Sequence, residues 1–192
     1  MKNLFSVLLA SLFSLTAFAG NISINENTPS IVGIAASNDN FTTLVAAVEA
    51  ADLVATLDKQ GPFTVFAPVN SAFDKLPEGT VSSLLKPENK STLTSILTYH
   101  VVQGEFKASD VVEAIKINGG SFTIPTVQGG TLVAKIVDGA VVLKDEKGAM
   151  STIVLTDVEA SNGIIHAIDS IVMPMSKDMT QKSKVKSKSS CH

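Results

Sequence analysis

The stretches GPFTVFAPVNSAF at residues 61–73 and NGIIHAIDSIVMP at residues 162–174 carry most of the structural information in this chain. Each is a short apolar run, bounded by turn residues and containing a proline at or near its end, which is typical of a buried strand with a hard stop. The second run is apolar enough to predict a strand covered on both faces. We expect the two runs, called here the first and second box, to form adjacent core strands.

The first 19 residues have the features of a secretory signal peptide. Lys2 precedes an uncharged apolar stretch at residues 4–18, and Ala17-Phe18-Ala19 is a small-x-small cleavage site. The apolar stretch is shorter than the roughly 20 residues that a membrane-spanning helix needs. The sequence therefore predicts cleavage after Ala19, a periplasmic or secreted protein, and no transmembrane segment.

Charge divides the rest of the chain into an acidic part and a basic end. Residues 20–174 contain 9 Lys and 17 Asp or Glu, a net charge of −8, whereas residues 175–192 contain 5 Lys and 1 Asp, a net charge of +4. All 15 basic residues are Lys, so no guanidinium is present to make bidentate contacts with phosphate or guanine. We therefore predict no nucleic-acid binding, and a Lys/Ser-rich disordered tail at residues 175–192. The single cysteine, Cys191, leaves no internal disulfide framework.

Residues 30–100 read mainly as helices. Apolar residues recur at steps of three and four over Thr42–Asp58, which predicts one amphipathic helix that ends before Gly61-Pro62. Asn70 is placed to cap a short helix over residues 71–76. A further helix over residues 91–99 directs His100 inward.

From Val101 onward the pattern changes to strands and tight turns. Alternating runs at residues 122–127, 131–137 and 140–144 are joined by glycine-containing turns, and longer strands follow at 152–158 and 163–173. The prediction is a single α+β domain, with helices first and a mostly antiparallel sheet second.

Three linked motifs support a resemblance to a known family. TVFAPVNSAF (residues 64–73), the Tyr99-His100 pair before Val101-Val102, and the second box resemble the motifs of the fasciclin-like (FAS1) domain family, and FTTLVAAVEAADL (residues 41–53) is similar to its opening helix. The resemblance covers residues 28–174. It implies a wedge or sandwich of strands with several helices, a secreted or surface-held protein, and a role in adhesion or matrix contact. The motif positions are Thr64, Phe66, Pro68, Asn70, Phe73, Asn162, Gly163, His166, Asp169 and Pro174.

The resemblance also implies candidate contact residues. Asp157-Val158 matches, in part, the adhesive Asp-Ile pair that precedes the second box in animal members of the family, and Tyr99-His100 matches the other motif linked to adhesion. The implied partner is a protein or a cell-surface or matrix component. A structural role is the alternative for Tyr99, with its ring packed and its hydroxyl hydrogen-bonded. An Arg-Gly-Asp motif is impossible without Arg.

Catalytic and metal-binding roles find little support in the sequence. His166 and Asp169 are three positions apart, which in a regular strand places their side chains on opposite faces. No Gly-x-Ser-x-Gly elbow occurs, so we expect a non-enzymatic protein. We interpret His166 as a core histidine hydrogen-bonded to a backbone or side-chain group of the first box, with Asn70 as the candidate partner. The three histidines do not have the sequence spacing of metal ligands, and we expect the Asp145-Glu146 pair to be solvated in a turn. No metal or cofactor is therefore expected.

A second hypothesis is a carrier of an apolar small molecule. Some members of the resembled family bind carotenoid-like pigments. The many Val, Ile and Leu side chains allow a lipid- or carotenoid-sized groove between the helices and the sheet. An ordinary filled core is the competing interpretation.

Overall fold

A computed structural model describes residues 28–59 and 61–175. The predicted signal peptide and residues 176–192 of the predicted tail lie outside this range. The described chain forms one α+β domain around a seven-stranded sheet, with strand order β2-β1-β7-β6-β5-β4-β3. The fold class predicted from the sequence is confirmed. The strands are β1 Phe63–Pro68, β2 Val101–Gln103, β3 Ser121–Pro125, β4 Thr131–Val137, β5 Ala140–Lys144, β6 Met150–Ala160 and β7 Gly163–Ile168.

The two boxes form the parallel pair at the centre of the sheet. β1 and β7 run side by side in register from Phe63 opposite Gly163 to Pro68 opposite Ile168, and every other strand pairing among the described residues is antiparallel. All six residues of β7 are buried. The prediction of adjacent core strands, with the second covered on both faces, is confirmed.

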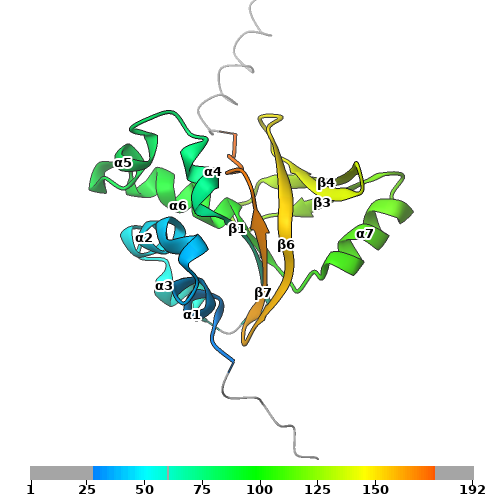
Figure 1. Cartoon of the computed structure of the whole chain (residues 1–192), viewed down its shortest axis with the longest axis horizontal. Coiled ribbons are helices and arrows are strands. Elements are labelled where there is room, and N and C mark those ends of the chain that lie inside the picture. The colour runs from blue at the N-terminus through cyan, green and yellow to red at the C-terminus, as the bar shows by residue number, and fades with distance from the viewer. Residues whose placement is uncertain (1–27, 60, 176–192) are drawn as a thin grey trace, which may run out of the picture.

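Helices cover one face of this central pair. They are α1 Ile31–Ala36, α2 Thr42–Ala50, α3 Val54–Leu57, α4 Asn70–Asp74, α5 Thr80–Leu84 and α6 Lys90–Tyr99, with short 3-10 turns at Asp39–Phe41 and Pro87–Asn89. In Figure 1 these helices lie together on one side of β1 and β7. Because side chains alternate along a strand, Val65 and Ile165 pack into this helical layer while Phe66 and Ile168 pack into a second apolar layer on the other face.

The second layer joins the central strands to an outer half of the sheet, made of β3, β4, β5 and the start of β6. Buried side chains from this half, such as Ile124, Leu132 and Leu143, meet Phe66 and Ile168. A helix not predicted from the sequence, α7 Ala108–Ile117, covers the outer strands through Val111 and Ile115 (Figure 1). The sequence pattern after Val101 predicts strands only, because α7 is rich in Val and Ile, residues that favour strands.

The predicted helix over Thr42–Asp58 is wrong in its length, since it is two helices. α2 ends in a Schellman motif, in which Leu53 N–H donates to Val48 O and Asp52 N–H donates to Glu49 O. Asp52 takes the left-handed conformation that this motif requires, with φ of 56°. The apolar periodicity continues through the break, so periodicity alone does not reveal it.

The strand predicted over residues 163–173 ends early, at Ile168. The side chain of the next residue, Asp169, accepts a hydrogen bond from the backbone N–H of Thr152 on β6 (2.8 Å). The backbone N–H of Asp169 still donates to Thr152 O (3.1 Å), but its carboxylate takes the place of a backbone carbonyl as the acceptor for Thr152 N–H, and the regular ladder ends here. Val172 is nevertheless buried, which explains why the apolar pattern extends beyond the strand.

Candidate functional site

Most polar residues of the two boxes bind the backbone of distant elements. Asn162 Oδ1 accepts from the N–H of Ile31 at the start of α1 (2.9 Å). Its amide donates to the carbonyl oxygens of Leu57 (2.7 Å), the last residue of α3, and of Lys59 (3.1 Å). Helix ends leave backbone groups without partners, and one side chain here supplies partners to two helices. Asn162 thus fixes the helical layer against the start of β7.

Asn70 has an equivalent role in the first box. Its Oδ1 accepts from the N–H of Thr43 (3.1 Å) in the first turn of α2, and its Nδ2 donates to Asp39 O (2.7 Å). Two predictions for Asn70 are wrong. Asn70 is the first residue of α4 and does not cap that helix, since its side chain caps α2. Asn70 is also not the hydrogen-bond partner of His166. Spacing along the chain suggests a local cap, whereas the fold brings a remote helix end closer.

His166 is a buried core histidine, as expected, but its hydrogen-bond partners are backbone groups outside the first box. Nε2–H donates to Phe106 O (2.8 Å) and Nδ1 accepts from the N–H of Asp157 (3.3 Å). The ring also stacks on Phe66, with centroids 5.7 Å apart. Both ring nitrogens therefore have backbone partners, Nε2 as a donor and Nδ1 as an acceptor.

Asp157 and Val158 lie at an irregular point of β6. Leu155 pairs with Ala167 and Val158 with Ile165, so Thr156 and Asp157 together lie opposite His166 in a β-bulge. Asp157 has a left-handed backbone, with φ of 55°, and its exposed carboxylate accepts from the N–H of Ala108 at the start of α7 (2.8 Å). Negative charge is favourable at a helix N-terminus, so Asp157 connects β6 to α7 while remaining exposed.

Tyr99 is fully buried, with 0% of its surface exposed. Its hydroxyl donates to Thr131 O (2.6 Å) and accepts from the N–H of Glu146 (3.3 Å), which ties α6 to the outer half of the sheet. Burial raises the pKa of Tyr99 to about 12, since the phenolate would lose its hydration. This geometry matches the structural alternative considered for Tyr99.

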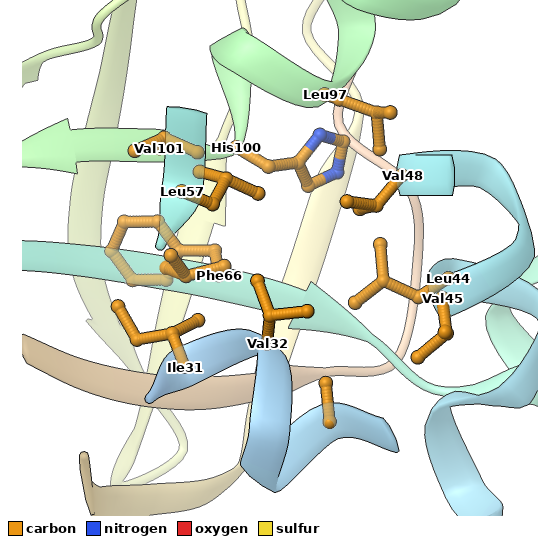
Figure 2. A pocket seen from close by; sticks show the side chains of 12 residues that line it. Ile31, Val32, Leu44, Val45, Val48, Leu57, Phe66, Leu97, His100 and Val101 are labelled. Carbon is orange, nitrogen blue, oxygen red and sulfur yellow. The ribbon is translucent and has the colours of Figure 1, made fainter. Parts of the chain in front are cut away.

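His100 is 2% exposed and lies at the junction of α6 and β2. Figure 2 shows its imidazole among the aliphatic side chains of Leu57, Leu97 and Val48, at the edge of an apolar cavity of about 30 Å³. Nδ1 is 2.8 Å from Ile96 O and Nε2 accepts from the N–H of Val172 (3.3 Å). Burial lowers the pKa of His100 to about 4, so the ring is neutral near neutral pH.

The structure does not bring the two candidate contact motifs together. Tyr99-His100 precedes β2, whereas Asp157-Val158 lies in β6, and β1 and β7 separate these strands. Tyr99 and His100 present no surface to a macromolecule in this conformation, whereas Asp157 is exposed and Val158 is half-buried. The exposed candidate is therefore the bulge of β6.

The other motif residues also have partners inside the domain. Thr64 Oγ1 donates to Gly104 O (2.8 Å) and accepts from Phe106 N–H (2.9 Å). Asp169 accepts from Thr152 N–H and from Lys75 Nζ (3.1 Å), and although its partial burial acts in the opposite direction, these two donors lower its pKa. His166 and Asp169 thus have separate partners and form no reactive pair.

Asp145 is a structural residue that the sequence analysis assigned wrongly. It was interpreted as solvated, but it is 5% exposed. Its carboxylate accepts from the N–H groups of Lys147 (2.9 Å), Ala149 (2.8 Å) and Met173 (2.9 Å), which fixes the β5–β6 turn and the segment after β7. The spacing Asp-x-Lys-Gly-Ala is that of an Asx-type turn, a local signal that was available in the sequence.

No group of three or more His, Cys, Asp or Glu side chains in residues 28–59 and 61–175 is arranged to hold a metal ion. Among the same residues, no helix has both the length and the apolar character needed to cross a membrane.

Comparison with known proteins identifies the family. The fasciclin domain model matches residues 39–174. The chain belongs to the fasciclin domain family. Protein sll1483 of Synechocystis is 48% identical over 149 residues, which cover 78% of this chain and 76% of that protein. The fasciclin domain therefore accounts for nearly all of the described structure.

Other relatives differ in size and setting. Immunogenic protein MPB70 of Mycobacterium bovis is 37% identical over 161 residues, covering 81% of this chain and 75% of that protein. Transforming growth factor-beta-induced protein ig-h3 of Oryctolagus cuniculus is 32% identical over 162 residues, 83% of this chain but 21% of that protein. A FAS1 domain pair from the insect cell adhesion molecule fasciclin I shares the fold, with a TM-score of 0.66 at 21% identity over 79% of this chain and 52% of that one.

Proposed function

We propose that this fasciclin domain is an exported, non-enzymatic module that acts by contact with a protein or a cell-surface or matrix component. The main supporting observation is that the polar side chains of the family motifs hydrogen-bond within the domain. Thr64, Asn70, Asn162 and His166 all hydrogen-bond to backbone groups of the domain itself. Side chains engaged in this way build a rigid scaffold and leave no assembled nucleophile and base.

The bulge of β6 is the contact site that we propose within this function. Asp157 is exposed, and its backbone is held by His166 on one side while its carboxylate is held by α7 on the other. A charged group that is fixed before binding loses little conformational freedom when a partner arrives. The description of the insect structural relative as a cell adhesion molecule supports the same class of function.

The test is attachment of the purified exported protein to its own producing cells. Asp157→Asn keeps the oxygen that accepts from Ala108 but removes the charge, so the fold is preserved. The matched control is Asp138→Asn, an exposed aspartate with a similar left-handed φ of 51° in the β4–β5 turn. We expect weaker attachment for Asp157→Asn only. Equal attachment of both variants and the wild type would rule out the bulge as the site.

The carrier hypothesis has weaker support. The apolar cavity lies between the helices and the sheet, where a carrier groove was expected, but its volume is only about 30 Å³. Ligand pockets are roughly 300–1,000 Å³. A lipid- or carotenoid-sized ligand therefore requires the helical layer to separate from β1. Protein from the native host that is colourless and free of extractable lipid would exclude this function.

A further inference from the structure

One face of the outer half of the sheet is open. Side chains of β3, β4, β5 and β6 that point inward are buried against α7 and the central strands, among them Ile124, Leu132 and Leu143. The alternate side chains form the opposite face, and in Figure 1 no labelled helix of the described chain covers this side of β3 and β4. Met150 and Val154 of β6 are 65% and 57% exposed.

The open face carries lysines and hydroxyls but no carboxylate. Two rows cross the strands: Thr123, Val133, Lys144 and Met150 in one, and Ser121, Lys135, Val142 and Thr152 in the other. Of these eight residues, Val142 is buried, at 8% exposure, and the others are half-buried or exposed. Lys135 and Lys144 are diagonal neighbours on adjacent strands, roughly 7 to 8 Å apart between Cα atoms. Such a face is unexpected on a domain whose residues 20–174 have a net charge of −8.

A third lysine joins this face at the end of β5. Lys135, Lys144 and Lys147 line one shallow hollow of about 560 Å³ together with Ser121, Thr123 and Val133. All three lysines are exposed, and none takes part in the three ion pairs found within residues 28–59 and 61–175. Lys147 Nζ makes one weak contact, with Met173 Sδ (3.8 Å), which leaves its charge unpaired. Their ammonium groups are therefore available to an anion outside the domain. We call Lys135, Lys144 and Lys147 the lysine face.

Two carboxylates at the rim of the hollow are engaged elsewhere. Asp145 is buried and accepts from three backbone N–H groups, as described above. Glu146 Oε1 accepts from Thr131 N–H (3.1 Å) and Oε2 accepts from Met175 N–H (3.0 Å). Backbone donors partly compensate both negative charges, so the lysine ammonium groups dominate the exposed charge of the hollow.

We infer that the lysine face binds an anionic polysaccharide, carrying carboxylate or sulfate groups along an extended chain. The face is shallow and spans several strands, which fits a linear polymer better than a compact small molecule. Lysines supply charge contacts, and the hydroxyls of Ser121, Thr123 and Thr152 can hydrogen-bond to sugar hydroxyls. This inference rests on the proposed contact function and adds to it a second contact surface, separate from the β6 bulge, with one class of partner.

Equilibrium binding to immobilised polymers tests the inference. The probes are dextran sulfate and polygalacturonate, with uncharged dextran as the reference, and the protein is the full exported chain. We expect binding to at least one polyanion that weakens with added salt, and none to dextran. Replacement of all three lysines of the face by Gln should weaken polyanion binding by about tenfold or more.

The matched control removes the same charge elsewhere. Lys59→Gln, Lys86→Gln and Lys116→Gln change three exposed lysines that also lie outside the three ion pairs of the described residues. Because both triple variants keep the Lys-rich C-terminal segment, its contribution is the same in each. The control should stay within about twofold of the wild type, and the Lys135→Arg, Lys144→Arg, Lys147→Arg variant, which keeps the charge, should retain binding.

Several results would overturn the inference. The first is an equal loss of polyanion binding in the two triple Gln variants, and the second is no polyanion binding by the wild type at low salt. The third is a concentration-dependent dimer, seen by sedimentation, that only the lysine-face variant abolishes, because it would assign the face to a second copy of the chain. Attachment to producing cells separates this inference from the broader function. A lysine-face variant that attaches like the wild type would refute the inference alone, whereas a wild-type protein that does not attach would refute the contact function.

Discussion

The central and outer halves of the sheet use the same strand geometry in opposite ways. β1 and β7 are covered on both faces, and every residue of β7 is buried. The outer strands bury one face against α7 and leave the other exposed, with Lys135, Lys144 and Met150 on it. The comparison teaches that the strongest sequence motifs mark the part of this domain that holds it together, whereas the less distinctive strands hold the surface that a partner can reach.

Substitution of glycine should reveal the largest difference between the halves. A Cβ at Gly163 would overlap the carbonyl oxygen of Phe63 on β1, whereas a Cβ at Gly139 in the β4–β5 turn would meet open space. Gly163→Ala should therefore lower the free energy of unfolding by about 4 kcal/mol or prevent folding. Gly139→Ala should lower it by about 1 kcal/mol, the penalty of its left-handed backbone. Urea unfolding measures both, and equal effects would contradict the comparison.

Acid should destabilise the central half through His100. The unfolded histidine binds its proton near pH 6.5, whereas the buried ring has a pKa of about 4 and resists protonation. The unfolded state therefore binds more protons in this window, and stability should fall by about 3 kcal/mol as the pH decreases from 6.5 to 4.

The difference between the wild type and His100→Gln isolates this contribution. The variant cannot titrate at position 100, so its stability should change less over the same window in urea unfolding at matched pH values. Parallel curves for the two proteins would show that His100 is not the buried neutral group described here.

Alkali should act where the two halves meet, at Tyr99. The pKa of Tyr99 is raised to about 12, above the value of 10 in the unfolded state. Its contribution to the free energy of unfolding is therefore complete below pH 10, and we expect the protein to lose about 2 kcal/mol of stability as the pH rises towards 12. Tyr99 is the only tyrosine and the chain has no tryptophan, so tyrosinate absorbance reports this group alone. A titration midpoint near 10 in the folded protein would mean that the hydroxyl is accessible to water.

Loss of a remote cap should have the smallest of these effects. Asn162→Ala removes partners from α1 and from the end of α3 and should lower the free energy of unfolding by about 1 to 2 kcal/mol. Asn118→Ala is the outer-half counterpart, since the exposed Asn118 side chain binds only Ala114 O at the end of its own helix (2.7 Å). We expect Asn118→Ala to lower the free energy of unfolding by at most about 0.5 kcal/mol. A similar loss in both variants would show that the remote contacts add little.

Apolar patterns predicted the strands of this domain better than its helices. The runs at 131–137 and 140–144 match β4 and β5 because Asp138-Gly139 marks their turn unambiguously. α7 was missed because its Val and Ile residues also favour a strand. The break at Asp52 was missed because a Schellman motif with aspartate in place of glycine leaves the helical periodicity unchanged.

For the candidate site, the sequence predicted which residues belong to it but not which hydrogen bonds they make. Asp157 follows from the family resemblance, but nothing near it in the sequence indicates that its N–H meets His166 or that its carboxylate meets Ala108. These partners are 9 and 49 residues away along the chain. Hydrogen bonds at such separations depend on how layers pack, which local patterns do not encode.

The sequence by itself determined the α+β class, the two core strands and the family, because apolar periodicity, turn residues and linked motifs are local properties of the chain. Only the tertiary structure decided that Asn70 and Asn162 cap distant helices, that Tyr99 and His100 are enclosed, and that three lysines share an open face. The physical reason is that the burial of a residue and its hydrogen-bond partners depend on what packs against it. In this domain, those neighbours come from other elements of the fold.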